Sequence, residues 1–403
     1  MVKSLIDVDL YKLTMMQFFF KYYNNTVVKF KFNNRTDINL GYYIDKDRLI
    51  NELNSVKKLN FKPGEVEYLR GLGYFEDDFL DYLKNYKLPN ITVDNVNGRF
   101  DIHTTANWHD VTLWETIVLS TINELYYYSK YSKNETEAAE KKGLDTLRGK
   151  LDLLKSDNIT SVITDFGTRR RFSHKWQDIV IKEIKNHPAF VGTSNVYFAK
   201  KYNMKPVGTN AHELYMVAAG INADTDDNLK SSHSKIMNQW YEMYGEDLSI
   251  GLTDTFGSNF FFEDFKDKAD KWKGLRHDSG SPEHFGNRVV TYYNHLNIDS
   301  SNKLLVFSDG LDVDKIIDLH DMFIQHINLS FGWGTKLTND LGFETLSIVM
   351  KAVEVVSHNN VTLNNMLVKL SDNLNKNLGT PEDLKRYKRV FGYVNNQRER
   401  LEV

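Results

Sequence analysis

The stretch "KGLRHDSGSPEHFGNRVV", Lys273–Val290, shows the pattern that decides the fold. A short apolar run ends in the polar turn Asp278-Ser279-Gly280, and a helical pattern follows at once. Ser281 and Pro282 are typical of a helix N-cap and a first-turn proline. The stretch therefore predicts a strand, a glycine turn and a helix, in that order.

The same pattern occurs about seven times from residue 160 onward. The apolar runs are "SVITDFG", "AFVGTS", "KPVGTN", "LSIGLTDTFG", "KGLRHDSG", "KLLVFSDG" and "INLSFGWGT". Repeated strand, turn and helix indicate a parallel α/β fold, and both a barrel and an open doubly wound sheet are compatible with it. The polar turns favour the barrel, because turns at the ends of its strands meet at one mouth.

The two ends of the chain have other patterns. "DVDLYKLTMMQFFFKYY" predicts a helix with Leu10, Leu13, Met16 and Phe20 as an apolar stripe, and "VVKFKFNNRT" alternates as a half-buried strand does. "PGEVEYLRGLG" and "EDDFLDYLKNY" predict two more helices. The last stretch, "MLVKLSDNLNKNLGTPEDLKRYKRVFGY", is alternating and basic, and we expect it to pack on the N-terminal domain.

Composition narrows the class of protein. The 403 residues are 41% hydrophobic, which suffices for a large core and suggests two domains. A net charge of -3 gives no general case for a nucleic-acid or membrane partner, and the absence of cysteine excludes disulfides and thiolate chemistry. Asp7 and Asp9 interrupt the apolar N-terminal stretch and argue against a signal peptide, so we expect a soluble cytoplasmic protein.

The turn in "PVGTNAHELYM", Pro206–Met216, delivers His212 and Glu213 together. A histidine there is compatible with a catalyst, a metal ligand or a residue that only begins a helix. The neighbouring candidates Thr193, Ser194 and Asn210 are also compatible with helix caps.

Other turns carry residues suited to anions. Phe166 precedes three consecutive arginines, 169–171, which are compatible with a solvated loop or with an anion site beside an aromatic ring. The seventh turn has Gly332, Gly334 and Thr335, which are typical of a phosphate-binding loop, and the last turns of such barrels commonly bind phosphate. Three acids follow strands and could hold magnesium through a substrate phosphate: Asp254, Asp278 and Asp309.

Several other catalytic devices are missing from the sequence. It contains no G-x-S-x-G nucleophile elbow, no H-E-x-x-H zinc motif and no Walker loop. Any use of ATP must therefore rely on a different phosphate-binding arrangement.

Seven motifs in order carry a family resemblance: "DLYKLTM", "DFGTRRR", "GTSNV", "GTNAHE", "GLRHDSG", "FSDGLD" and "GWGTKL". Together they resemble the nicotinate phosphoribosyltransferase family, from the first ten residues to "VKLSDN" near the C-terminus. The resemblance implies an irregular TIM-like α/β barrel, over residues 136–345, and a mixed α/β domain built from residues 1–135 with 346–403. It also implies a homodimer with shared active sites.

The activity that the resemblance implies is ATP-driven synthesis of nicotinate mononucleotide from nicotinate and phosphoribosyl pyrophosphate. This reaction belongs to NAD salvage, proceeds through a phosphohistidine and uses Mg²⁺, and it would class the chain as an ATP-dependent ligase or glycosyltransferase.

The implied roles fall on residues of the seven motifs. His212 matches the phosphorylated histidine, with Asp278 and Glu213 completing the catalytic set. The implied nicotinate set is Tyr11, Phe166, Arg169, Ser194, Thr209 and Arg276, in which Tyr11 completes the neighbouring subunit's pocket. The implied phosphoribosyl pyrophosphate set is Arg276, Asp278, Asp309, Gly310, Gly332, Gly334 and Thr335. Asp278 and Asp309 would bind the ribose hydroxyls or magnesium, with Asp309 as the metal ligand.

Two rival functions remain open. Nicotinamide phosphoribosyltransferases are similar but place an aspartate where "GTSNV" has Ser194, and an aspartate would repel the carboxylate of nicotinate. A non-catalytic nucleotide-binding barrel is the second rival, against which the complete set of His212, Arg276 and Asp278 argues.

Overall fold

The computed structural model describes residues 1–160 and 162–393, and its internal contacts divide the chain into two compact units. Unit 1 comprises Met1–Gly208, Leu311–Ile317 and Phe331–Lys351. Unit 2 comprises Thr209–Gly310, Asp318–Ser330 and the chain from Ala352 onward. Ser161, the first residue of the first predicted strand run, and residues 394–403 of the predicted mixed domain lie outside the described residues.

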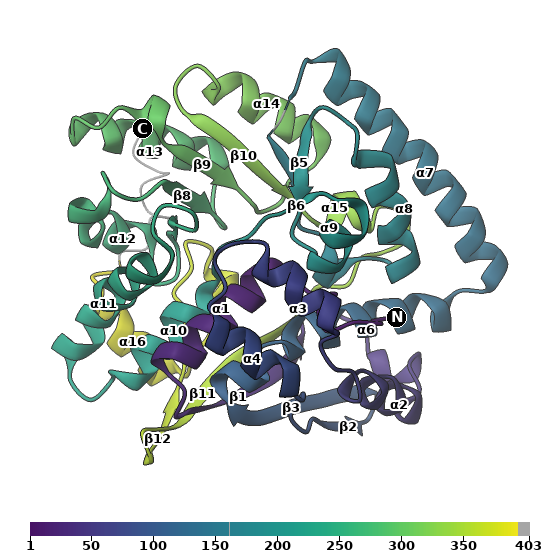
Figure 1. Cartoon of the computed structure of the whole chain (residues 1–403), viewed down its shortest axis with the longest axis horizontal. Coiled ribbons are helices and arrows are strands. Elements are labelled where there is room, and N and C mark those ends of the chain that lie inside the picture. Colours follow the sequence, from purple (N-terminus) through teal and green to yellow (C-terminus); the bar gives the residue numbers. More distant parts are fainter. Residues whose placement is uncertain (161, 394–403) are drawn as a thin grey trace. The chain divides into compact units, whose positions relative to one another are not determined.

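Each of the seven predicted apolar runs contains a strand of one parallel sheet. The strands are β4 (Ile163–Asp165), β5 (Phe190–Thr193), β6 (Lys205–Pro206), β7 (Ile250–Leu252), β8 (Gly274–His277), β9 (Leu304–Phe307) and β10 (Asn328–Trp333). Their order is β6-β5-β4-β10-β9-β8-β7, so chain neighbours lie side by side and the last strand, β10, adjoins the first, β4. Figure 1 shows β8, β9 and β10 next to one another.

The predicted α/β barrel is therefore confirmed as a curled half-barrel. No pairing joins β6 to β7 in the part of the chain that the structure describes. The segment that connects these two strands holds α10 (His212–Ile221) and α11 (Asp226–Tyr244). The opening of the sheet thus coincides with the stretch that carries His212.

Helices follow the other strands, as the repeated pattern predicts. They are α8 (His174–Ile184), α9 (Val196–Tyr202), α12 (Ser258–Asp264), α13 (Pro282–His295), α14 (Val313–Phe323) and α15 (Thr335–Thr338). The Ser281 hydroxyl accepts the backbone N–H of His284, which confirms the predicted cap. The cap of α9 is Asn195 rather than Thr193 or Ser194, and Asn210 makes no cap bond to α10.

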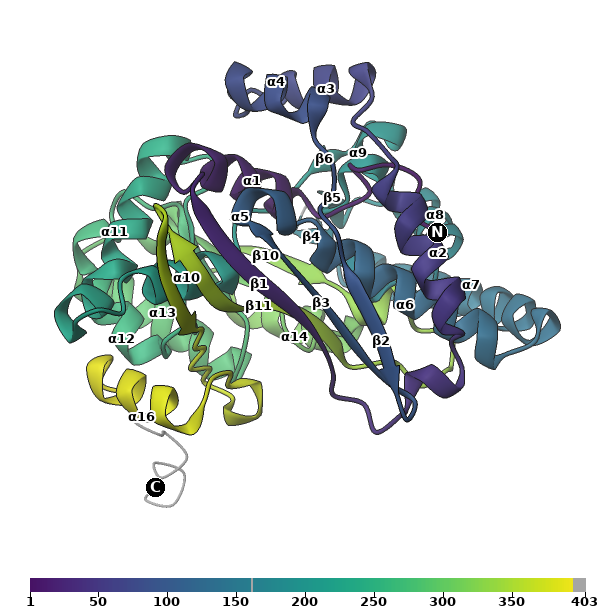
Figure 2. The ribbon, with the colours of Figure 1, turned by 90° about the horizontal axis from the view of Figure 1, so that it is seen from below.

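A second, antiparallel sheet has the order β12-β11-β1-β3-β2. In unit 1, β1 (Thr26–Asn34) pairs with β3 (Arg99–Asn107), which pairs with β2 (Thr92–Val96); Figure 2 shows these three strands side by side. The burial along β1 alternates, as its sequence predicts. Both predicted helices are present as α3 (Pro63–Arg70) and α4 (Asp77–Asn85), and unit 1 also holds α2 (Lys46–Lys57), α5 (Trp108–Val111), α6 (Trp114–Lys130) and α7 (Lys133–Ser156).

The N-terminal helix α1 (Leu10–Tyr22) is confirmed, but its predicted single apolar stripe is wrong. Every residue from Leu10 to Phe19 is buried, including Lys12 and Gln17. A helix that is buried on all sides lies inside a core rather than on its surface. The ring of Phe19 stacks on that of Trp108, with centroids 3.5 Å apart.

The C-terminal segment first contributes two strands to the antiparallel sheet and then packs against residues of unit 2. β11 (Ile348–His358) and β12 (Val361–Met366) belong to the antiparallel sheet, which thus combines both ends of the chain. The chain belongs to unit 2 from Ala352, and after β12 it contacts other residues of that unit. Leu370 donates its N–H to the carbonyl of Thr255, and two arginines of α16 (Pro381–Val390) pair with Asp226. After β12 the described contacts of the C-terminal segment are thus with unit 2, and not with the N-terminal domain as expected. The predicted domain boundaries stay a prediction.

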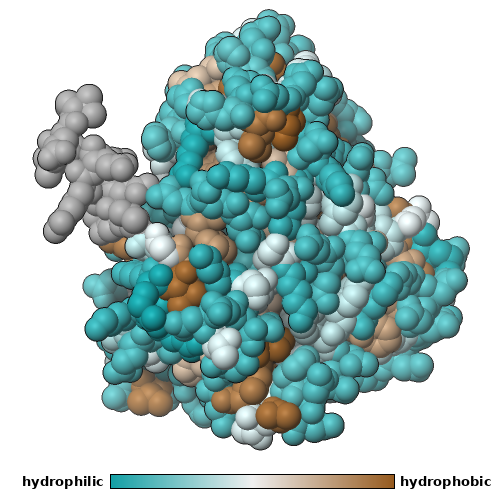
Figure 3. Space-filling model, turned by 90° about the vertical axis from the view of Figure 1, so that its left-hand side faces the viewer, coloured by the Kyte–Doolittle hydropathy of each residue, from teal (hydrophilic) through white to brown (hydrophobic). Residues whose placement is uncertain are grey.

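The surface is largely polar on the face that Figure 3 shows, where hydrophobic residues form only small separate patches. Among the helices of the described residues, none combines the length and the apolar character needed to cross a bilayer.

Candidate active site

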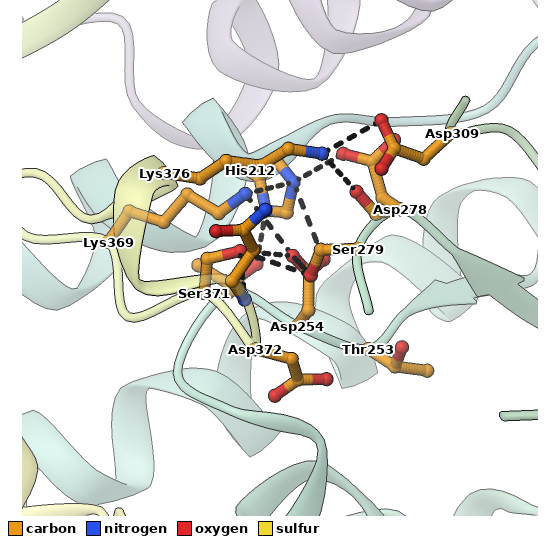
Figure 4. A network of polar contacts seen from close by, with 12 residues as sticks. His212, Thr253, Asp254, Asp278, Ser279, Asp309, Lys369, Ser371, Asp372 and Lys376 are labelled. Carbon is orange, nitrogen blue, oxygen red and sulfur yellow. Dashed lines mark hydrogen bonds and ion pairs between the residues drawn. The ribbon is translucent and has the colours of Figure 1, made fainter. Parts of the chain in front are cut away.

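His212 lies at the centre of a polar cluster in unit 2, drawn in Figure 4. Its Nε2 atom lies 2.8 Å from Asp278 Oδ2 and 2.9 Å from Lys369 Nζ. Its Nδ1 atom lies 2.9 Å from Thr255 Oγ1. Asp254 completes this set, which we call the His212 cluster, with Oδ2 3.2 Å from Lys369 Nζ.

The fold brings these side chains together from turns of the half-barrel. His212 begins α10, Thr255 follows β7 and Asp278 follows β8. Lys369 arrives from the C-terminal segment, which is hydrogen-bonded to the turn after β7 by the Leu370 N–H and the Thr255 carbonyl. Parallel strands end at one edge of a sheet, so residues far apart in sequence meet there.

The acids of the cluster are held by a dense set of donors. Asp254 accepts from the hydroxyls of Ser279, at 2.6 Å, and Ser371, at 3.1 Å. Asp278 Oδ1 accepts from the hydroxyl of Ser308, at 3.2 Å. These fixed donors stabilise both acids as carboxylates.

Burial and charge set the protonation states. Burial, together with the Lys369 ammonium, lowers the pKa of His212 to about 4, so the imidazole is neutral at neutral pH. Burial alone would raise the pKa of Asp254, but Lys369 and His212 outweigh it and lower this pKa. The hydrogen bond from His212 outweighs burial in the same way and lowers the pKa of Asp278.

Three ligand atoms of this cluster lie close enough to surround a metal ion. One atom each from His212, Asp254 and Asp278 falls within 4.8 Å of the others. The Lys369 ammonium already contacts His212 and Asp254, so a cation of the protein itself occupies this position. Asp309, whose carboxylate is 39% exposed after β9, is of the type that binds Mg²⁺ together with waters and phosphates, and its role as the metal ligand stays a prediction.

A second lysine of the C-terminal segment lies beside Asp309. Lys376 Nζ is 2.8 Å from Asp309 Oδ1 and donates to the backbone carbonyl of Asp278 at 2.9 Å. Gly310 follows with φ 64°, the left-handed conformation that glycine adopts without strain. Two lysines thus approach the turns after β7, β8 and β9.

Arg276, also in unit 2, lies on β8 next to these turns. Its Nη1 donates to the carbonyl of Asn210 at 3.0 Å, which holds the guanidinium against the turn before His212. Its Nε is buried and has no hydrogen-bond partner among the described residues. A buried guanidinium donor without a partner suits an anionic ligand. Thr209 is half-buried in the same turn.

Four predicted residues of the nicotinate set lie in unit 1. Arg169 Nη1 donates to Glu115 at 3.1 Å, and its guanidinium lies 5.6 Å from the ring centroid of Tyr11. The Ser194 hydroxyl donates to Asp9 at 2.6 Å, and Arg169 Nε lies 3.7 Å from the same carboxylate. Ser194 is therefore already bonded to an acid, and Arg169 already faces two carboxylates.

Tyr11 contacts residues of its own chain. Its hydroxyl lies 3.5 Å from Glu115, and the N–H of the preceding Leu10 donates to the Ser194 carbonyl at 2.7 Å. The expected contribution of Tyr11 to a neighbouring subunit stays a prediction.

The third arginine of the run has a structural role. Arg171 and Asp7 are fully buried and form two parallel hydrogen bonds, of 2.7 and 2.8 Å. Asp7 also accepts from Asn195, and Arg171 donates to Gln177. This network joins the stretch before α1 to the turns after β4 and β5. Of the three arginines, only Arg170 is exposed.

Phe166, half-buried, is the fourth of these residues, and the glycines of the seventh turn lie near it. A side chain on Gly332 would place its Cβ 2.3 Å from the Phe166 ring, so this glycine makes room for the ring. Gly334 precedes the short helix α15, which begins at Thr335. Their predicted contact with a phosphate stays a prediction.

The structure thus assembles His212, Asp278 and Asp309 with Arg276 in unit 2, and Tyr11, Arg169 and Ser194 in unit 1. The described partners of the His212 ring are Thr255, Asp278 and Lys369. Glu213 follows His212 in α10, where adjacent residues do not face each other, and its catalytic role stays a prediction. Sequence reasoning missed Lys369 and Lys376, whose alternation in "VKLSDNLNK" resembles an ordinary basic strand.

Comparisons with known proteins identify the family of the chain. The sequence models of the nicotinate phosphoribosyltransferase (NAPRTase) family and its N-terminal domain match residues 162–395 and 6–123. The chain is 37% identical over 360 residues to a nicotinate phosphoribosyltransferase of Escherichia coli (strain SMS-3-5 / SECEC), covering 87% of this chain and 88% of that one.

Solved structures are similar over almost the whole chain. A crystal structure of nicotinate phosphoribosyltransferase from Porphyromonas gingivalis has a TM-score of 0.87 and 31% identity, and covers 98% of this chain and 100% of its own. One from Vibrio cholerae has a TM-score of 0.87 and 29% identity, with 100% and 97% covered. The chain belongs to the nicotinate phosphoribosyltransferase family.

Proposed function

We propose that the chain is a nicotinate phosphoribosyltransferase of NAD salvage. In this reaction the ring nitrogen of nicotinate forms a bond to C1 of the ribose, and pyrophosphate leaves with the electrons of the broken C–O bond. The pyridine nitrogen is already a nucleophile, so the residues mainly position the reactants and stabilise the departing charge.

We also propose that ATP drives the reaction through phosphorylation of His212. The observation that carries this proposal is a neutral imidazole, only 13% exposed, between a lysine and two carboxylates. A neutral imidazole has a lone pair that can attack a phosphoryl group, and the N–P bond can later be hydrolysed. Lys369 and Lys376 would offset phosphate charge without a Walker loop.

Magnesium fits this proposal at Asp309. A bound magnesium ion would supply positive charge that offsets the charge of the phosphates. Asp309 would hold the ion, Asp278 would bind the ribose hydroxyls, and Lys376 would move from the Asp309 carboxylate to the phosphates.

Arg276 is the proposed partner of the nicotinate carboxylate, since its buried Nε has no partner among the described residues. Ser194 is less suited to this role than its sequence indicated, because its hydroxyl proton is bonded to Asp9. Arg169, with its two carboxylate neighbours, is kept as an alternative partner for an anion.

The test is an assay of pyrophosphate release from phosphoribosyl pyrophosphate with nicotinate, with nicotinamide, and with no pyridine. We expect release with nicotinate, faster in the presence of ATP. Release with nicotinamide but not with nicotinate would favour a nicotinamide phosphoribosyltransferase. No release with either pyridine would favour a non-catalytic nucleotide-binding protein.

A homodimer with shared sites is proposed as the working assembly. Tyr11→Ala and His212→Ala subunits, mixed under conditions that exchange subunits, test the sharing. Activity in mixed dimers that neither variant shows alone would support it, whereas inactive mixed dimers would place Tyr11 in its own subunit's site.

A further inference from the structure

The two partners of His212 Nε2 require opposite protonation states of this nitrogen. Lys369 has only donors, and an ionised Asp278 has only acceptors. They lie 2.9 and 2.8 Å from the same nitrogen, which carries either a proton or a lone pair. Nε2 can therefore satisfy only one of them at a time.

The other ring nitrogen has a partner that suits both tautomers. Thr255 Oγ1, 2.9 Å from Nδ1, can donate a hydrogen bond or accept one. In one state, Nε2–H donates to Asp278 and Thr255 donates to Nδ1. In the other state, Nδ1–H donates to Thr255 and Lys369 donates to the lone pair on Nε2.

We propose that phosphoryl transfer uses the second state: Nε2 is the atom phosphorylated, Thr255 holds the proton on Nδ1, and Lys369 orients Nε2 and then binds the phosphoryl oxygens. This inference rests on the proposed phosphohistidine. It assigns positioning roles to two residues outside the predicted site.

The surroundings of the two nitrogens support the choice of Nε2. Lys369 is the only lysine or arginine whose contact with the ring is described, and it lies on the Nε2 side. Its own side chain is 2% exposed and is held by Asp254 at 3.2 Å, so its ammonium has a fixed position. Nδ1 faces a hydroxyl, which offers no charge to a phosphoryl group.

The Nε2 lone pair forms the N–P bond while the bond from the γ-phosphorus of ATP to its bridging oxygen breaks, and ADP leaves with that electron pair. The proton stays on Nδ1. Asp278, no longer bonded to Nε2–H, is released for its proposed contact with the ribose. On hydrolysis, water attacks phosphorus and the electron pair returns to Nε2.

The first measurement is ¹⁵N NMR of the full-length protein with ¹⁵N-labelled histidine, after reaction with ATP. The nitrogen coupled to ³¹P is assigned by its couplings to the two ring protons. We expect coupling at Nε2, and coupling at Nδ1 would overturn the inference.

The second measurement is the single-turnover rate of labelling by γ-labelled ATP. Lys369→Met should slow labelling about tenfold to hundredfold, as the loss of a charge-assisted hydrogen bond does. Thr255→Val should slow it as well, and Thr255→Ser, which keeps the hydroxyl, should restore it. Lys385→Met removes an exposed lysine of the same C-terminal segment and is the matched control.

Labelling of Lys369→Met within about twofold of the wild-type rate would overturn the role of Lys369. If that variant does not fold, the inference is tested by the NMR assignment of the phosphorylated nitrogen and by the labelling rates of Thr255→Val and Thr255→Ser. No label on the wild-type protein would instead overturn the phosphohistidine itself, and the inference with it.

Discussion

The buried ion pair of Asp7 and Arg171 should stabilise unit 1, and Asp7 also accepts a hydrogen bond from Asn195, the neighbour of Ser194 in the predicted nicotinate set. Asp7→Asn keeps the shape of the side chain but leaves a fully buried guanidinium without its counter-charge. Breaking one partner of such a pair costs about 3–5 kcal/mol. Units of this size lose about 2–4 °C of Tm per kcal/mol, so unit 1 should lose about 6–20 °C.

The pH dependence of this effect follows from the direction of the pKa shift. Burial alone would raise the pKa of Asp7, but the Arg171 guanidinium outweighs it and lowers this pKa. A lowered carboxyl pKa contributes stability that is complete above its unfolded value, about 4, and is lost as the pH falls through the folded value. The difference in Tm between wild type and Asp7→Asn should stay constant from pH 7 to about 5 and shrink only in stronger acid.

The assay is thermal unfolding by circular dichroism across this pH range. Glu137→Gln is the control, because it removes an exposed ion pair with Lys133 that should contribute less than about 1 kcal/mol. A loss of less than about 2 °C for Asp7→Asn, or an equal loss for the control, would show that the buried pair does not stabilise unit 1.

Four further predictions concern ligands. Arg276→Ala should lower kcat/KM for nicotinate by about tenfold or more, because the loss of a charge-assisted hydrogen bond costs about 1.5–3 kcal/mol. An unchanged kcat/KM in steady-state kinetics would contradict this prediction. Ser194→Asp would set a second carboxylate beside Asp9, so nicotinate binding measured by calorimetry should weaken; equal affinity would exclude Ser194 from the pocket. Gly332→Ala should displace the Phe166 ring and raise KM for nicotinate, and a wild-type KM would show that the ring does not bind the substrate. Asp309→Asn should raise the magnesium concentration that gives half-maximal rate, and an unchanged magnesium titration would remove Asp309 as the ligand.

Much of the fold could be predicted because its signals are local. An apolar run followed by a polar turn predicts each strand of the half-barrel, and Ser281 and Pro282 predict the start of the helix that follows β8. The open edge between β6 and β7 has no such signal, because it depends on which strands pair over long distances. Burial of α1 on every side likewise depends on packing that helical spacing does not reveal.

The site divides in the same way. His212, Asp278 and Arg276 stand in turns after strands, where the chemistry of a barrel is expected, and the structure groups them in unit 2. Lys369 follows no parallel strand, and its contact with His212 spans 157 residues. Ser194 shows the opposite case: the sequence indicated a hydroxyl available for a ligand, but Asp9, 185 residues away, accepts the hydrogen bond that this hydroxyl donates.

We propose above that this chain makes nicotinate mononucleotide with a phosphorylated His212 as intermediate. The most direct measurement is the formation of nicotinate mononucleotide from nicotinate and phosphoribosyl pyrophosphate, with and without ATP, in the wild type and in His212→Asn. We predict that ATP accelerates the wild type and not the variant, which keeps only a slow rate. Equal stimulation of both proteins by ATP would contradict the role of His212, and no product from the wild type would contradict the proposed activity.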